Sequence, residues 1–73
     1  MKVETIGQRI RFLRLKHNMT QKNLAAALHV SESTVSYWEC GKTEPSIMFI
    51  IQLVVLFQTS LNYLIIGNEN TTL

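Results

Sequence analysis

The sequence predicts an all-α fold, a single domain of five short helices. Apolar residues recur every three or four positions along most of the chain, as on one face of a helix, and no segment alternates like a half-buried strand. A Ser or Thr, which favours helix N-termini, precedes each apolar segment. At 73 residues the chain can bury one small core. We expect the domain to cover residues 1–67 and the short polar tail, residues 68–73, to be frayed.

The first helix is expected to begin after Thr5 and to end at about His17. Thr5 and Gln8 are spaced as in a capping box, where each side chain bonds to the backbone N–H group of the other. Asn18 tolerates the left-handed conformation that ends many helices, and Met19 beyond it can turn into the core.

Two short helices with a tight turn between them should follow, over residues 21–28 and 31–40. Thr20 is the expected N-cap of the first helix and Ser31 that of the second, which Gly41 stops. Because the turn between them has only about three residues, the two helices must cross at a steep angle.

Two apolar helices complete the expected set, from Ser46 to about Phe57 and from Ser60 to about Ile66. Gly67 ends the second of them. This region carries no charged residue and is long enough to be considered as a membrane span. Polar side chains interrupt it, however, and the break before Ser60 divides it into two short helices. We therefore expect no membrane segment.

Charge and cysteine content restrict the possible functions. The net charge is +2, and six of the seven Lys and Arg residues lie within residues 1–22. This basic end suits a surface that faces phosphate groups, although a solvated helix face would look the same. The single Cys40 cannot form an internal disulfide, and no Cys and His residues have zinc-ligand spacing. We expect no metal, no cofactor, no secretion signal and a cytoplasmic protein.

One ordered set of residues spans the two crossing helices and their turn: Thr20-Gln21-Lys22-Asn23-Leu24-Ala25, Leu28, Val30-Ser31, Val35-Ser36, Trp38-Glu39 and Gly41-Lys42. The set resembles the Cro/C1-type (Xre-like) helix-turn-helix transcriptional regulators, and similar matches extend over nearly the whole chain. The resemblance implies a five-helix lambda-repressor-like DNA-binding domain, with the helix-turn-helix formed by helices 2 and 3. It also implies a prokaryotic regulator that binds double-stranded DNA at specific sequences and acts as a repressor.

Several residues of this set are expected to be structural. The helix-turn-helix core should consist of Ala25, Leu28, Val30, Val35 and Trp38. Ala25 is small because the third helix crosses the second closely there. The resemblance pairs Arg14 with Glu39 in a partly buried ion pair between the first and third helices.

Three positions depart from the family pattern. His29 stands where the family usually has Gly, so it must adopt a positive φ at some cost. Cys40 stands where the family often has Asn, which puts a phosphate contact in doubt. Gln58 replaces a frequent Gly, which puts the shape of one loop in doubt.

The outer face of the third helix is the expected site of base contacts. With Val35 and Trp38 inward, helical spacing places Ser33, Ser36 and Tyr37 outward, together with Cys40. A solvent-facing stripe could have this composition, but the resemblance favours close approach to bases in the major groove. Glu32 either interacts with the helix dipole alone or accepts a hydrogen bond from a cytosine amino group.

Phosphate contacts are expected from residues that fix the register of the protein on DNA. Gln21 and Lys22 lie at the N-terminus of the second helix, and Lys42 follows the third. The sequence leaves open whether Arg11 and Lys16 face DNA or water.

The residues contain no catalytic arrangement. No nucleophile paired with a base, no carboxylate pair and no phosphate-binding Gly loop occurs, so an enzyme is not expected. The alternatives to a DNA-binding regulator are a protein-binding adaptor or an antitoxin of the same fold, with a toxin or co-regulator as an unidentified partner.

A homodimer is expected from apolar residues at positions where related sequences usually carry polar ones. The proposed dimer surface contains Met48, Phe49, Val55, Leu61, Tyr63 and Ile65. A two-fold dimer would present two recognition helices to a pseudo-palindromic operator with half-sites about 10 bp apart. The alternative is that these side chains only enlarge a small core.

Overall fold

The computed structural model describes residues 3–67, and within them five helices follow one another along the chain. They are α1 (Ile6–Lys16), α2 (Gln21–Leu28), α3 (Glu32–Cys40), α4 (Ile47–Phe57) and η1 (Asn62–Ile66), the last a single wide turn of π-helix. The expected five-helix, all-α fold is confirmed. The tail expected to be frayed, residues 68–73, lies outside the described residues.

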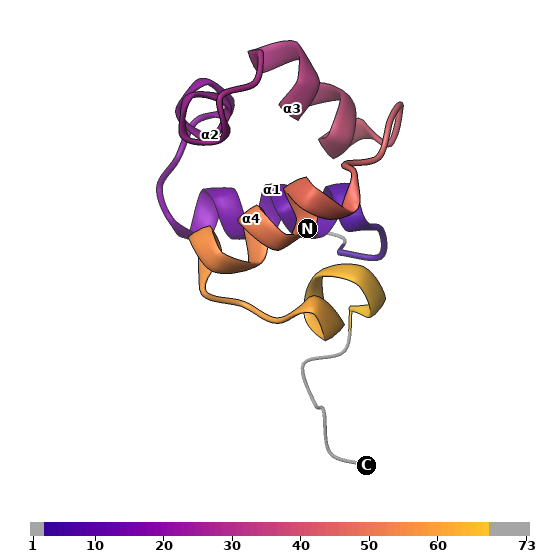
Figure 1. The fold of residues 1–73 in the computed structure, drawn as a ribbon. Helices are drawn as coiled ribbons and strands as arrows, with labels where there is room; N and C mark the ends of the chain where they lie inside the picture. The colour runs from indigo at the N-terminus through magenta and orange to yellow at the C-terminus, as the bar shows by residue number, and fades with distance from the viewer. Residues whose placement is uncertain (1–2, 68–73) are drawn as a thin grey trace.

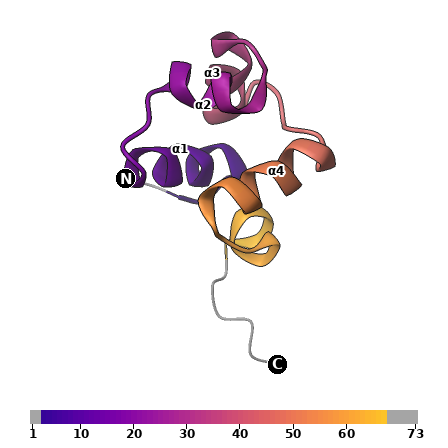
Figure 2. The same ribbon diagram turned by 60° about the vertical axis from the view of Figure 1, so that its left-hand side comes forward.

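Helix α1 is the central element of the arrangement. Helices α2 and α3 lie on one side of it, and α4 and η1 lie toward the other (Figures 1 and 2). Each helix contributes one large side chain that is completely or almost completely buried, and these are Ile10, Leu24, Val35, Leu53 and Leu64. The core is therefore built from all five helices.

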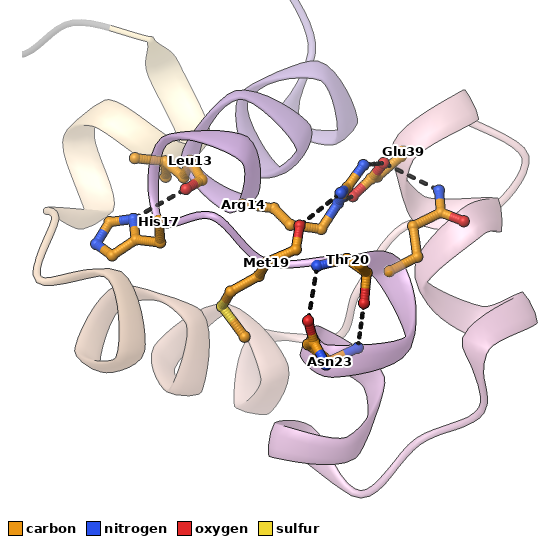
Figure 3. Close-up of polar contacts among 8 residues, drawn as sticks. Leu13, Arg14, His17, Met19, Thr20, Asn23 and Glu39 are labelled. Carbon is orange, nitrogen blue, oxygen red and sulfur yellow. Dashed lines mark hydrogen bonds and ion pairs between the residues drawn. The ribbon is translucent and has the colours of Figure 1, made fainter.

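Side-chain caps begin the first three helices as the sequence predicts. Thr5 and Gln8 form the expected capping box at α1. At the N-terminus of α2, the Thr20 hydroxyl accepts a hydrogen bond from the backbone N–H of Asn23 at 3.0 Å. The side-chain oxygen of Asn23 accepts one from the backbone N–H of Thr20 (Figure 3). Ser31 accepts from the N–H of Thr34 at the start of α3.

The last two helices begin less regularly than expected. Ser46 occupies the N-cap position of α4 but makes no side-chain capping bond. Ser60 accepts a hydrogen bond from the N–H of Tyr63 at 3.0 Å, as a cap would, yet the turn that follows is π-helical. Gly67 ends this turn with a φ of 89°.

Among residues 3–67, three residues other than glycine adopt the left-handed conformation, and all three follow a helix. They are Asn18, His29 and Gln58, with φ values of 58°, 59° and 53°. The positive φ expected for His29 is confirmed. Gln58 takes the same conformation at the end of α4, so that loop turns as it would with glycine.

We expect His29→Gly to raise the free energy of unfolding by about 0.5 to 1 kcal/mol. The left-handed conformation costs an ordinary residue about 1 to 2 kcal/mol, and glycine avoids this cost. Glycine also loses more conformational entropy on folding, which cancels part of the stabilisation. Ala26→Gly is the matched control because Ala26 is exposed within α2, so that change should lose about 1 kcal/mol. Urea titration measures both, and a loss of stability in His29→Gly would contradict the prediction.

The expected helix-turn-helix core is present. Ala25, Leu28, Val35 and Trp38 are buried, and Val30 is half-buried against them. On α4, Ile50, Leu53 and Phe57 are buried and Val54 packs beside them. No helix within residues 3–67 has both the length and the apolar character needed to cross a membrane.

Two residues expected on an exposed apolar surface lie elsewhere. Tyr63 is only 8% exposed, because it shares the inward side of η1 with Leu64. Phe49 is half-buried, and its ring centroid lies 5.4 Å from that of Trp38. Both aromatic rings pack against the core, so the expected exposure is wrong for Tyr63 and only partial for Phe49.

Arg9 is a buried cation that the sequence pattern did not reveal. Its Nε donates to the carbonyl oxygen of Leu64 at 2.9 Å and its Nη2 to that of Ile65 at 2.9 Å. Its Nη1 donates to the carbonyl oxygen of Val3, also at 2.9 Å. One side chain of α1 thus joins the start of the described chain to the end of η1.

Candidate nucleic-acid interface

The outer face of α3 is polar and built from short side chains. Ser33, Tyr37 and Cys40 are exposed and Ser36 is half-buried, as the helical spacing predicts. Glu32 is also exposed and lies in the first turn of α3, where its carboxylate is favourable for the helix dipole. Tyr37 is the largest side chain of this face and is 40% exposed. Such a surface allows another molecule to approach the helix closely.

The two expected phosphate-binding elements lie at the ends of the helix-turn-helix. Lys22 is exposed in the first turn of α2, where the leading N–H groups have no partners within the helix. Lys42 is exposed directly after Gly41, and its Nζ lies 4.5 Å from the centre of the Tyr37 ring. Gln21 is half-buried, and its Nε2 donates to Glu39 Oε1 at 3.1 Å.

The ion pair expected between Arg14 and Glu39 is present and doubly hydrogen-bonded (Figure 3). Arg14 Nε donates to Glu39 Oε2 at 2.7 Å and Nη2 donates to Oε1 at 3.0 Å. The third nitrogen, Nη1, donates to the carbonyl oxygen of Met19 at 2.8 Å. The two side chains are only 9% and 4% exposed. The pair therefore fixes α3 to α1 and to the chain that enters α2.

A shallow hollow lies above this ion pair. It is lined by Arg11, Arg14, Gln21, Ser36, Glu39 and Cys40. Arg11 is exposed and therefore shares a surface with the N-terminus of α2 and the outer side of α3. Lys16 is exposed but does not line the hollow. Arg11 precedes Arg14 by three residues, and this helical spacing was the available signal that both face the same side.

A second surface, apolar and exposed, covers the outer side of α4 and part of η1. Met48 and Val55 are 62% and 71% exposed, and Leu61 and Ile65 are also exposed, as expected. Four further residues, Ile47, Ile51, Leu56 and Ile66, are exposed on these two helices as well, although the sequence pattern did not indicate them. Because α4 carries apolar residues on nearly every side of its axis, apolar character alone does not separate its exposed residues from its buried ones.

Comparison with known proteins gives consistent matches. A helix-turn-helix family model matches residues 10–64. The chain is 39% identical over 66 residues to the HTH-type transcriptional regulator DicA of Escherichia coli, covering 90% of this chain and 49% of DicA. It is 33% identical over 72 residues to Repressor protein C2 of Salmonella phage P22, covering 99% of this chain and 33% of the repressor. The chain thus spans about half the length of DicA and a third of C2.

A solved structure shares the fold over the same region. The crystal structure of the P22 c2 repressor protein in complex with a synthetic operator has a TM-score of 0.83 and 33% sequence identity. The match covers 90% of this chain and 100% of that one. The arrangement of helices around α2 and α3 is therefore that of a domain solved on DNA.

Proposed function

This chain belongs to the Cro/C1-type helix-turn-helix family of DNA-binding transcription regulators, and on that basis we propose that it is a repressor that binds specific sites in double-stranded DNA. In this proposal α3 enters the major groove and the N-terminus of α2 meets the phosphate backbone. The protein acts by binding, without a catalytic role or a cofactor. It works where its operator lies, in the cytoplasm of a prokaryotic cell.

One observation carries the proposal: the helices of this chain match those of a repressor that was solved on its operator. The exposed face of α3 supports it independently. Small hydroxyl side chains such as Ser33 let the helix approach base edges closely, and they can both donate and accept hydrogen bonds. Two cationic groups, Arg11 and Lys42, lie beside the C-terminal half of this face, which favours a surface that meets phosphate groups over one that only faces water.

We assign the base contacts to Glu32, Ser33, Ser36 and Tyr37. The exposed carboxylate of Glu32 is suited to accept a hydrogen bond from the amino group of a cytosine. Phosphate contacts come from Gln21, Lys22 and Lys42, and we add Arg11 because it lines the same hollow as Gln21. The Gln21 amide bonds to Glu39, which orients its side chain at the edge of this hollow.

We expect Tyr37→Ala and Ser33→Ala to lower the preference for the operator over mismatched DNA by about 1 to 3 kcal/mol for each hydrogen bond or apolar contact to a base that the change removes. Lys22→Ala is the matched control, because removal of a phosphate-binding side chain should weaken binding to all sequences alike. It should also reduce the slope of log affinity against log salt concentration by about one. Fluorescence anisotropy measures these affinities on a site selected from random DNA, at several salt concentrations.

Two results would count against the assignment. If Tyr37→Ala and Ser33→Ala kept full discrimination, the outer face of α3 would not contact the bases. If the wild-type protein showed no salt-dependent binding to any DNA, the fold would serve as a protein-binding adaptor or antitoxin instead.

We also propose that the protein is a homodimer joined through the outer side of α4. A helix that is apolar all around is normally covered on every side, and in the monomer Met48 and Val55 remain exposed. A second copy of the same surface would cover them around a two-fold axis, together with Ile51, Leu61 and Ile65. The two α3 helices of the dimer would then contact DNA half-sites about 10 bp apart.

Met48→Glu and Val55→Glu should each convert the dimer into a folded monomer, because each places a charge in the apolar interface. The free energy of unfolding of the monomer should change little, since both side chains are exposed in it. Ala27→Glu is the control, because Ala27 is an exposed apolar residue on α2, and it should leave the dimer intact. Sedimentation at micromolar concentration measures the oligomeric state of each protein. If the wild-type protein is a monomer there, the dimer proposal is wrong.

A further inference from the structure

Lys42 contacts Tyr37 through both its backbone and its side chain. The N–H of Lys42 donates to the carbonyl oxygen of Tyr37 at 2.9 Å, and that of Thr43 donates to the same oxygen at 3.4 Å. The Lys42 side chain then folds back so that its ammonium lies 4.5 Å from the centre of the Tyr37 ring. Gly41 permits this reversal because its φ is 82°, in the left-handed region that residues with a β-carbon rarely adopt.

This contact restricts a ring that would otherwise be free to turn. Tyr37 is 40% exposed, and within residues 3–67 it does not belong to the buried core. A cation over an exposed aromatic face favours that geometry by about two- to fivefold over geometries without it. One face of the ring is therefore occupied by the ammonium, while the ring edge and the hydroxyl group stay available at the outer side of α3.

We propose that Lys42 is a positioning residue for base recognition: its ammonium holds the Tyr37 ring in the orientation that α3 presents to DNA. The inference rests on the proposed function and deepens it. An ammonium has three N–H donors, so it can bond to a phosphate oxygen while its charge still attracts the ring. The phosphate contact thus helps to set the recognition of a base pair that Lys42 does not touch.

Lys22 provides a comparison within the same chain. It is also an exposed lysine expected to contact phosphate, but no aromatic ring within residues 3–67 lies against its ammonium. If both lysines were only phosphate contacts, replacing either would weaken binding to all DNA sequences by a constant factor. Only the replacement of a lysine that positions Tyr37 changes the ratio of the affinities for two different sequences.

The test measures dissociation constants for the selected operator and for its single base-pair variants. Tyr37→Leu first identifies the base pair that Tyr37 recognises. Lys42→Ala should lower discrimination at that base pair by about two- to fivefold, in addition to weakening all complexes. Lys42→Arg should restore discrimination, because a guanidinium also binds an aromatic face. Lys22→Ala should leave discrimination unchanged, and so should Lys42→Ala in a Tyr37→Leu background.

A measurement without DNA separates this inference from the proposed function. In the free protein, the ring of Tyr37 should shift the NMR signals of the Lys42 side-chain methylene groups upfield, and Tyr37→Leu should remove that shift. If the shift is absent, or if Lys42→Ala weakens all sequences equally, the positioning role is wrong although DNA binding stands. If the wild-type protein binds no DNA, the proposed function fails and the inference fails with it.

Discussion

Glu39→Ala should lower the free energy of unfolding by about 3 to 5 kcal/mol, because it leaves the buried guanidinium of Arg14 without its carboxylate. The loss is large for a domain of this size, since most domains are stable by only about 5 to 15 kcal/mol. The change also removes the acceptor of the Gln21 amide. Urea titration and thermal melts followed by circular dichroism measure the loss.

The cause of this loss can be tested with a double replacement. Arg14→Met together with Glu39→Leu removes both charges of the pair, so neither is left buried without its partner, and the double variant should be more stable than Glu39→Ala alone. Arg11→Ala is the control, because Arg11 is exposed on the same helix, and it should change stability by less than about 0.5 kcal/mol. A loss below about 1 kcal/mol in Glu39→Ala would mean that the pair behaves like an exposed surface pair.

Helix boundaries were predictable because the groups that set them are local. Thr20 and Asn23 are three residues apart, and that spacing alone brings each side chain to the other's backbone N–H group. The positive φ of His29 was predictable from the family resemblance, because related sequences usually have Gly at that position. Such features require no knowledge of distant parts of the chain.

Features that depend on distant contacts were not predictable from the local sequence pattern, and the Arg14–Glu39 pair was expected only because of the family resemblance. Arg9 bonds to carbonyl groups of residues 64 and 65, and neither pattern nor composition indicates that α1 and η1 are adjacent. The placement of Phe49 depends on Trp38, a residue of another helix. On α4 the apolar residues lie on nearly every side of the axis, so apolar character alone did not indicate that Ile47 and Ile51 would be exposed.

The candidate interface also contains both predictable local features and features that depend on contacts between distant residues. Helical spacing within α3 was sufficient to place Ser33 and Tyr37 outward, because the inward residues of that helix are large and apolar. The position of Arg11 beside the α2 N-terminus required the angle between α1 and α2, which the sequence does not contain. The contact between Lys42 and Tyr37 required the path of the chain after Gly41.

Gly7→Ala should lower the free energy of unfolding by about 2 to 3 kcal/mol, although alanine is the better helix former. Gly7 lies where α1 passes closest to the C-terminal half of α3. A β-carbon there would overlap the carbonyl oxygen of Trp38 and lie 3.0 Å from that of Glu39. Backbone atoms cannot move aside as a flexible side chain can, so α3 itself must shift. Overpacking of this kind typically costs about 1 to 3 kcal/mol.

The sign of the change makes this prediction decisive. If the space were open, replacing a glycine within a helix by alanine would stabilise the protein by about 1 kcal/mol. Stabilisation would therefore show that α1 and α3 are farther apart than the structure places them. Because Trp38 and Glu39 belong to α3, the shift should also displace the recognition face, and operator affinity should fall more than affinity for mismatched DNA. Chemical denaturation and anisotropy on the two DNAs measure these effects in the same preparation.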